Sequence, residues 1–216
     1  QDNFSNENFK FGTGKFVKIN DMKVWAQRLS YVGEIGFELY IETLHAKQLY
    51  KAIVEEGNNH NLTHCGMHAM DTMRMENGFL HWGHDISPEE NQYQAGLDFA
   101  ISYKKNVDFL GKEALLKIKD KKIEKKMIML TLKDKKPGDP LLLHDEPIYL
   151  DDKIIGRTTS GNYSFNFNKN LTFGYIDRDL NNLDTSKHKI YVEVGKVKHE
   201  AEYLRKVLNQ NNYKTI

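Results

Sequence analysis

The sequence predicts an α+β protein in which a mixed α/β part is followed by a small β-barrel or β-sandwich. Before a lysine-rich stretch at 111–126, strand-like and helix-like patterns alternate along the chain. After that stretch, short strand-like runs follow one another closely, and turn-rich pieces separate them. The chain has 216 residues and 39% hydrophobic content, so it can form one or two domains with cores of their own.

The elements of the first part follow from the spacing of its apolar residues. Strand-like runs surround the turn-forming pair Asn20-Asp21, which is a hairpin signal. Helix-like runs have apolar residues three and four apart and end near glycines. The predicted elements are a hairpin over 15–29, an extended run over 30–41, helices over 43–57 and 67–77, and a strand over 97–103.

After residue 125 the sequence pattern changes from alternating helix-like and strand-like runs to short strand-like runs alone. Residues 111–126 are rich in lysine and predict a solvated helix and linker. We therefore expect two domains, 1–125 and 126–216. The strand-like runs of the second domain are, in order, MIMLTL, PIYL, KIIGRTTS, LTFGYI and KIYVEVG.

Charge and composition exclude several classes of partner. The 31 basic and 30 acidic residues nearly cancel, so no long-range field favours nucleic acid or an anionic membrane. No apolar run approaches the roughly 20 residues that a membrane helix needs. A single cysteine, Cys65, cannot form an internal disulfide and fits a reducing compartment. We therefore expect a cytoplasmic protein without nucleic-acid or membrane partners.

The run SYVGEIGFELYI, residues 30–41, places a carboxylate within a strand-like pattern. The alternation after Gly36 directs Phe37 and Leu39 toward a core and Glu38 toward the opposite side. That side is either solvent or a binding site. An ordinary outward carboxylate is the commoner explanation, but glycines inside a strand often mark close approach of the backbone to a ligand.

The stretch GMHAMDTMRMENGFLHWGHDI, residues 66–86, offers an arginine and a polar, aromatic loop. The methionines at helical spacing are best explained as core filling. Arg74 can pair with Asp71 three residues earlier, or its planar fork can enter a pocket and bind an oxygen-rich ligand. Trp82 stands in the loop HWGHDI, which is either a hydrophobic anchor or a ligand platform.

The sequence signals for a metal site or a catalytic nucleophile are weak. His64 and His68 are four residues apart, which is ligand spacing on a helix, but no glutamate follows His64 as in the HExxH pattern. We therefore expect no metal. Cys65 lacks the motif of a nucleophile, and no Ser/His/Asp arrangement with recognisable flanks occurs.

Four stretches of the chain carry a family resemblance when they are taken together. They are SYVGEIGFELYI (30–41), GMHAMDTMRMENGFLHWGHDI (66–86), EENQYQAGLDFAISYKKNVDFLGKEAL (89–115) and IIGRTTSGNYSFNFNKNLTFGYI (154–176). In their order and spacing they resemble the folate-binding aminomethyltransferase family, which includes the glycine-cleavage T-protein and the C-terminal half of dimethylglycine and sarcosine dehydrogenases. The resemblance covers nearly all of the chain from about residue 7.

The resemblance implies a fold, a reaction and a set of ligand-binding residues. The fold is an incomplete ferredoxin-like α/β folate-binding part followed by a C-terminal antiparallel β-barrel. The reaction transfers a one-carbon unit from an iminium, derived from an N-methyl or aminomethyl donor, to tetrahydrofolate and gives 5,10-methylenetetrahydrofolate. Tyr31 and Glu38 match the first tyrosine and last glutamate of the family's Y-x-G-E-x-G-x-E run, which line the pterin pocket. Arg74 and Trp82 match an arginine and an aromatic residue near the folate.

The chain also departs from the family. No aspartate matches the family's catalytic aspartate, which belongs to an N-terminal half, so we predict no catalytic residue in this chain. No G-x-G-x-x-G fingerprint occurs, so any FAD belongs to a domain upstream. Gln92 follows Asn91 where the family has a proline. We expect a portion of a larger enzyme whose partners are folate, an amine donor and the missing N-terminal half or flavin domain.

Three alternatives remain open at this stage. The first is a flavin-linked N-methyl amine dehydrogenase, or instead a T-protein-like aminomethyltransferase. The second is a non-catalytic folate-binding module. The third is a demethylase that acts on a sulfonium or O-methyl substrate and uses the same folate acceptor.

Overall fold

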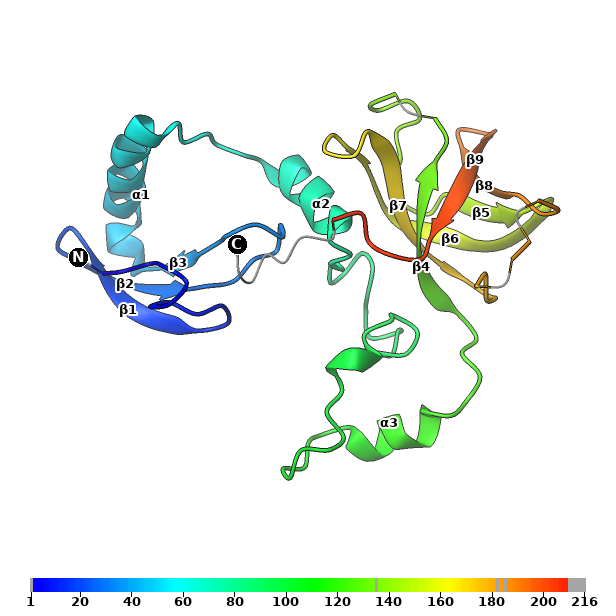
Figure 1. The fold of residues 1–216 in the computed structure, drawn as a ribbon, viewed down its shortest axis with the longest axis horizontal. Helices are drawn as coiled ribbons and strands as arrows, with labels where there is room; N and C mark the ends of the chain where they lie inside the picture. Colours follow the sequence, from blue (N-terminus) through cyan, green and yellow to red (C-terminus); the bar gives the residue numbers. More distant parts are fainter. Residues whose placement is uncertain (1, 135, 182, 185, 210–216) are drawn as a thin grey trace. The chain divides into compact units, whose positions relative to one another are not determined.

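The computed structural model describes residues 2–134, 136–181, 183–184 and 186–209. Within them the chain forms two compact units: residues 2–77 with Asn209, and residues 78–208. Figure 1 labels the elements of both units. None of the helices in these residues has the length and apolar character needed to cross a bilayer.

The first unit is built on a three-stranded antiparallel sheet. Strands β1 (Gly14–Ile19) and β2 (Met22–Gln27) form the predicted hairpin, and β2 also pairs with β3 (Glu38–Tyr40). Asn20 lies in the hairpin turn with φ of 51°, the left-handed region that asparagine tolerates better than most residues. The hairpin prediction is therefore confirmed.

Helix α1 (Thr43–Gly57) covers one face of this sheet. Its buried Leu49 belongs to a core with Val17 and Val24 from the sheet and with Phe9 from the entry segment. A short 3-10 turn, Asn58–His60, follows the helix. The helix forms where the apolar spacing predicts it, because that spacing gives one stripe of side chains to bury.

The segment before β3 differs from the extended run that the sequence predicts. Residues 31–35 form a bend, and only Glu38–Tyr40 is a strand. The two glycines explain the bend. Gly33 has φ of +72°, and a Cβ atom at Gly36 would lie 2.6 Å from the carbonyl oxygen of Leu29. The backbone folds back on itself too closely for a continuous strand.

We expect Gly33→Ala to destabilise the first unit by about 2 kcal/mol, through backbone strain and a clash together. The added Cβ would lie 2.2 Å from the side chain of Asn77, which hydrogen bonds to the carbonyls of Val32 and Met73 and so cannot move freely. Gly12→Ala is the control, because Gly12 has φ of +78° but open space around it. Urea denaturation measures both; equal losses would show that the contact with Asn77 contributes nothing.

Helix α2 (Met67–Glu76) forms as predicted, and Met75 is its fully buried methionine. The predicted strand over 97–103 is wrong. A 3-10 turn, Asp98–Ala100, lies there instead, and the amides of Leu97, Ala100 and Ile101 bond to carbonyls three to five residues earlier. These local bonds take the place of a partner strand. Helix α3 (Lys112–Ile118) follows and has no buried residue, as a solvated helix should.

The C-terminal part is a closed barrel of six antiparallel strands, which decides between the predicted barrel and sandwich. The order around the barrel is β4-β7-β6-β5-β8-β9, and β4 pairs with β9 to close it. The strands are β4 (Lys126–Leu132), β5 (Pro147–Leu150), β6 (Lys153–Ser164), β7 (Lys169–Ile176), β8 (Ile190–Val194) and β9 (Val197–Leu204).

The barrel core is aliphatic and comes from every strand. Leu130, Ile148 and Val192 are completely buried in it, and Ile155, Ile176 and Ala201 complete the ring of strands. The α+β class and the C-terminal antiparallel barrel are confirmed. The domain boundary between residues 125 and 126 stays a prediction: the first barrel strand begins at Lys126, while the compact units divide between Asn77 and Gly78.

Candidate functional site

Glu38 lies on β3 with its side chain exposed, on the side of the strand away from the core. Its neighbours Phe37 and Leu39 pack against the core of the first unit, as the alternation predicts. The hydroxyl of Tyr40 donates a hydrogen bond to the Glu38 carboxylate, and this bond raises the pKa of Tyr40. Tyr40 therefore remains a protonated donor at neutral pH, and the carboxylate keeps further acceptor positions.

Tyr31 lies at the start of the bend before β3 and is half-buried. The amide of Glu34, in the same bend, donates to the Ser30 hydroxyl at 3.1 Å. The Glu34 side chain itself is exposed. The bend thus presents Tyr31 and Glu34 a few residues before Glu38, and it is held by the close backbone approach at Gly36.

Arg74 is 1% exposed on α2. Its Nε and Nη2 atoms lie 2.8 Å and 2.7 Å from the same Asp71 oxygen, so the pairing suggested by the three-residue spacing is present. Burial and pairing show that Arg74 has a structural role in the first unit.

Trp82 belongs to the second unit and is 65% exposed. It lies in the tight turn 81–86, in which the amides of His84, Asp85 and Ile86 all donate to the carbonyl of His81. The ring centroids of His81 and His84 lie 4.6 Å apart, with the ring planes tilted by 44°. Of the four predicted residues, Tyr31, Glu38 and Arg74 therefore belong to the first unit and Trp82 to the second.

Asp85 anchors this turn to the barrel. It is 1% exposed, and its two oxygens accept from the His81 amide at 2.8 Å and the Thr159 hydroxyl at 2.5 Å. Thr159 lies at a β-bulge of β6, since Thr158 and Ser160 pair with the adjacent residues Gly174 and Phe173 of β7. A bulge redirects a side chain. Here it brings the Thr159 hydroxyl to Asp85.

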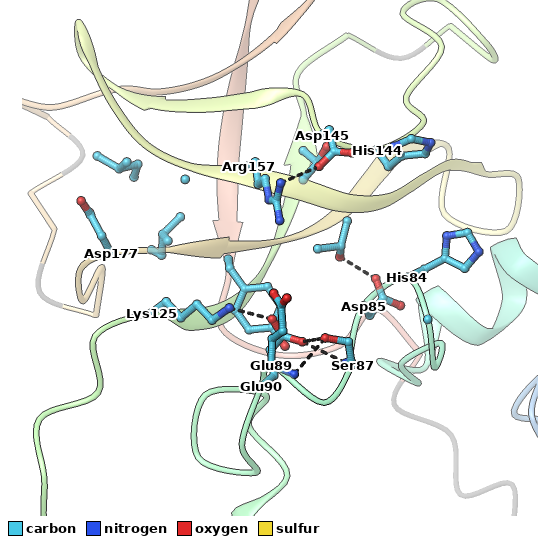
Figure 2. A pocket seen from close by; sticks show the side chains of 17 residues that line it. His84, Asp85, Ser87, Glu89, Glu90, Lys125, His144, Asp145, Arg157 and Asp177 are labelled. Atoms are coloured by element: carbon cyan, nitrogen blue, oxygen red, sulfur yellow. Dashed lines mark hydrogen bonds and ion pairs between the residues drawn. The ribbon is translucent and has the colours of Figure 1, made fainter.

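A cavity of about 690 Å³ lies in the second unit, between the segment 83–90 and the barrel. Figure 2 shows several of its charged side chains, among them Arg157 and Asp145 on the barrel and Glu89 and Glu90 on the segment 83–90. Residues of β6 and β7 form much of the barrel wall.

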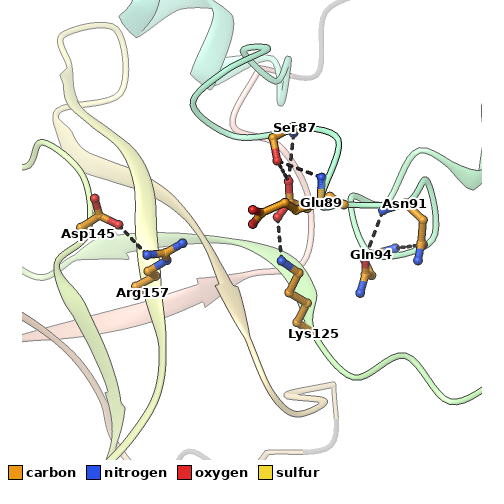
Figure 3. A network of polar contacts seen from close by, with 8 residues as sticks. Ser87, Glu89, Asn91, Gln94, Lys125, Asp145 and Arg157 are labelled. Carbon is orange, nitrogen blue, oxygen red and sulfur yellow. Dashed lines mark hydrogen bonds and ion pairs between the residues drawn. The ribbon is translucent and has the colours of Figure 1, made fainter.

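Glu90 is the centre of a polar network on one wall of the cavity (Figure 3). One carboxylate oxygen accepts from Lys125 Nζ at 2.6 Å, and the other accepts from the Ser87 amide and hydroxyl at 2.9 Å and 2.7 Å. Burial raises the pKa of Glu90, but the bonds from Lys125 and Ser87 outweigh it, so the net pKa is lowered. Glu90 is therefore a fixed negative charge at neutral pH.

Tyr175 on β7 also lines the cavity and is 8% exposed. Its hydroxyl is the one buried side-chain polar atom, among the residues that the structure describes, without a hydrogen-bond partner. Burial raises the pKa of this phenol, and the charges of Glu90 and Asp85 raise it further. The hydroxyl consequently stays protonated over the whole physiological range.

Sequence reasoning missed the cavity and its residues. Asp85 stands in the polar loop HWGHDI, and Glu90 and Tyr175 stand in stretches that resemble the family, but no motif gives these residues a role, and Lys125 stands in none of the stretches. Glu90 and Lys125 are 35 residues apart in sequence, and Asp85 and Thr159 are 74 apart. No periodic pattern joins residues at such distances.

The fold and the comparisons define one family. Residues 1–105 match the GCVT N-terminal domain, and residues 125–209 match the Glycine cleavage T-protein C-terminal barrel domain. The barrel match covers the six strands of the closed barrel. The chain belongs to the glycine cleavage T-protein family.

Curated relatives include two kinds of enzyme. The chain is 36% identical to the mitochondrial dimethylglycine dehydrogenase of Rattus norvegicus over 181 residues, which is 83% of this chain and 20% of the relative. It is 34% identical to the mitochondrial sarcosine dehydrogenase of Mus musculus over 80% of this chain and 18% of the relative. It is 36% identical to the aminomethyltransferase of Listeria welshimeri over 77% of this chain and 44% of the relative.

The chain thus spans about a fifth of the length of the matched dehydrogenases and less than half of the matched aminomethyltransferase. Among solved structures, the glycine cleavage system aminomethyltransferase T of Bartonella henselae matches with a TM-score of 0.77 and 21% identity. The match covers 94% of this chain and 53% of that one. At this identity it shows the fold alone.

Proposed function

We propose that this chain is the folate-binding portion of an enzyme that transfers a one-carbon unit to tetrahydrofolate. The unit comes from an iminium derived from an N-methyl amine, and the product is 5,10-methylenetetrahydrofolate. Membership of the T-protein family and the likeness to dimethylglycine and sarcosine dehydrogenases support the proposal. The observation that carries it is the exposed carboxylate of Glu38, which lies within the family's motif and faces away from the core.

The chemistry of Glu38 fits a pterin. A pterin edge presents a ring N–H beside an exocyclic amine, and a carboxylate accepts from both in a charge-assisted, bidentate contact. The Glu38 carboxylate accepts one hydrogen bond from the Tyr40 hydroxyl, and a carboxylate can accept several. The Tyr40 hydroxyl also holds the carboxylate in one orientation, which lowers the entropy lost when a ligand binds.

The other predicted residues have supporting roles in this proposal. Tyr31 lines the same pocket from the bend before β3. Arg74, already held by Asp71, provides a fixed cation near the folate. Trp82 is an exposed aromatic residue of the second unit, and for it the resemblance alone supports a role in stacking on the pterin ring.

The whole enzyme contains more than these residues in our proposal. A flavin domain that holds FAD oxidises the N-methyl amine, as in a dimethylglycine or sarcosine dehydrogenase, and an aspartate outside residues 1–216 activates the folate nitrogen. Tetrahydrofolate is the cofactor that this chain itself binds. The single Cys65, which is exposed, supports a reducing compartment such as the cytoplasm.

We expect Glu38→Gln to weaken binding of 5-formyltetrahydrofolate at least tenfold, because the amide replaces one acceptor with a donor facing the pterin N–H groups. Glu34→Gln is the matched control. It makes the same change of charge in an exposed side chain of the adjacent bend, and should leave the affinity within about twofold. Isothermal titration calorimetry measures both constants.

Circular dichroism should show that both variants keep the fold, since neither side chain is buried. Equal affinities of wild type and Glu38→Gln would remove the central support for the proposal. A non-catalytic folate-binding module would give the same titration. It differs from an enzyme in that the full-length protein, supplied with N-methyl amine and tetrahydrofolate, would form no 5,10-methylenetetrahydrofolate.

A further inference from the structure

The outer face of the three-stranded sheet, opposite α1, carries its side chains in rows. Val17 and Val24 pack into the core with Leu49 of α1, so the alternate residues of β1 and β2 point to the outer face. Residues that pair directly across the strands lie side by side on that face. One such row is aromatic: Phe16 pairs with Trp25, and Trp25 pairs with Tyr40.

The aromatic row, Phe16, Trp25 and Tyr40, is packed within itself and yet open to the outside. Phe16 and Tyr40 are 58% and 51% exposed, and the ring centroids of Phe16 and Trp25 lie 5.0 Å apart with their planes at 71°. The Trp25 ring occupies the space beside Gly14, where a Cβ atom would lie 2.5 Å from it. Exposed rings held in place by their neighbours form a stacking surface for a planar ligand.

The rows on either side of the aromatic row carry opposite charges. On one side lies Glu38 of β3. On the other side Lys18 pairs with Lys23 across the hairpin. Lys18 forms an exposed ion pair with Asp21 at 3.3 Å, whereas Lys23 Nζ lies over the ring of Phe16, 4.1 Å from its centroid. Lys23 therefore places a cation at the edge of the aromatic row.

The order of these groups along the sheet matches the order of groups in a folate. Glu38 pairs with Gln27, which lies four residues after Lys23 on β2. At about 3.3 Å per residue, the row of Glu38 and the row of Lys23 are about 13 Å apart, with the aromatic row between them. A folate has N–H donors on its pterin edge, then a benzoyl ring, then the two carboxylates of its glutamate.

We propose that the outer face of the sheet binds the tail of the folate, with the benzoyl ring stacked on the aromatic row and a glutamate carboxylate bound to Lys23. The inference rests on the proposed function, because it takes the pterin to be held by Glu38. A carboxylate and an ammonium group form a charge-assisted contact. A nucleic acid fits this face less well, because its phosphates would meet the carboxylate of Glu38 as well as the lysines.

Lys23→Gln tests the contact with the tail. The 216-residue chain is titrated by calorimetry with 5-formyltetrahydrofolate and with its diamide, in which both glutamate carboxylates are uncharged. The substitution should raise the Kd of the acid about fourfold and leave the Kd of the diamide unchanged. Lys47→Gln, which removes an exposed cation from α1, is the control and should change neither Kd. Equal effects of Lys23→Gln on the two ligands would overturn the proposal.

Phe16→Leu and Trp25→Leu test the stacking surface. Trp25→Leu should raise the Kd of both ligands about tenfold, and Phe16→Leu about threefold. Phe16 is exposed, so its substitution tests the proposal even if Trp25→Leu unfolds the first unit. A wild-type dimer that Phe16→Leu turns into a monomer in sedimentation would overturn the proposal, because the face would then join two copies of the chain.

The same titrations separate this inference from the proposed function. If Glu38→Gln weakens binding of 5-formyltetrahydrofolate while Lys23→Gln and Phe16→Leu leave it unchanged, the inference fails and the proposed function stands. If the wild-type chain binds neither ligand, both fail.

Discussion

Gly156→Ala is expected to destabilise the barrel by about 3 kcal/mol, which is the upper end of the usual cost of overpacking. A Cβ atom at this position would lie 1.8 Å from the carbonyl oxygen of Tyr175 and 2.9 Å from Cα of Ile176. Both contacts are with backbone, so no side-chain rotation relieves them. Gly156 also pairs with β5 on its other side, and a closed barrel has no free edge toward which β6 can move.

Hydrogen exchange of peptides from β6 and β7, together with urea denaturation, measures this effect on the barrel itself. Gly66→Ala is the control, because Gly66 has φ of −95° and no heavy atom within 4 Å of the added Cβ. Because Gly66 is the N-cap of α2, where glycine is preferred to alanine, this control should cost about 1 kcal/mol. Similar losses in the two variants would show that β7 yields to the added methyl group.

Asp85→Ala should cost about 3 kcal/mol and free the turn that carries Trp82. The substitution leaves the partly buried Thr159 hydroxyl and His81 amide without their acceptor, and an unsatisfied donor costs about 1–3 kcal/mol when it is fully buried. Amide exchange in residues 81–86 should accelerate more than amide exchange in β8. Neither of the two hydrogen bonds that Asp85 accepts involves a residue of β8. The barrel itself should remain folded.

A double-mutant cycle with Thr159→Val isolates the contact between the turn and β6. Thr159→Val alone should cost about 1 kcal/mol, and the pair of substitutions should cost less than the sum of the two. Additive losses would mean that the 2.5 Å bond between Asp85 and Thr159 does not couple the turn to the barrel.

Much of the fold could be predicted because its signals are local. Each of the correctly predicted elements buries one stripe or face of a short segment. These elements are the hairpin at Asn20, helices α1 and α2, and the first five barrel strands. The strand β9 was missed because Lys198, Glu200 and Glu202 give it a polar appearance, although its Ala201 is buried. The predicted strand over 97–103 failed because apolar residues alone do not supply a neighbouring strand.

In the candidate site, too, the features that depend on local patterns could be predicted, and those that depend on strand pairing could not. Alternation along residues 37–41 predicted the outward direction of Glu38, and three-residue spacing predicted the pair of Arg74 with Asp71. The β-bulge at Thr159 and the isolated hydroxyl of Tyr175 depend instead on how β6 and β7 pair within the closed barrel. Such features depend on the register in which β6 and β7 pair. A single sequence does not specify that register through any local pattern.

The most direct test of the central claim is hydrogen exchange of the 216-residue chain with and without saturating 5-formyltetrahydrofolate. Folate binding at the predicted residues should slow exchange in the peptide that contains 30–41 and in α2, and Glu38→Gln should abolish that change at the same ligand concentration. Unchanged exchange in both segments, or protection confined to the barrel, would contradict the assignment of this chain as a folate-binding portion.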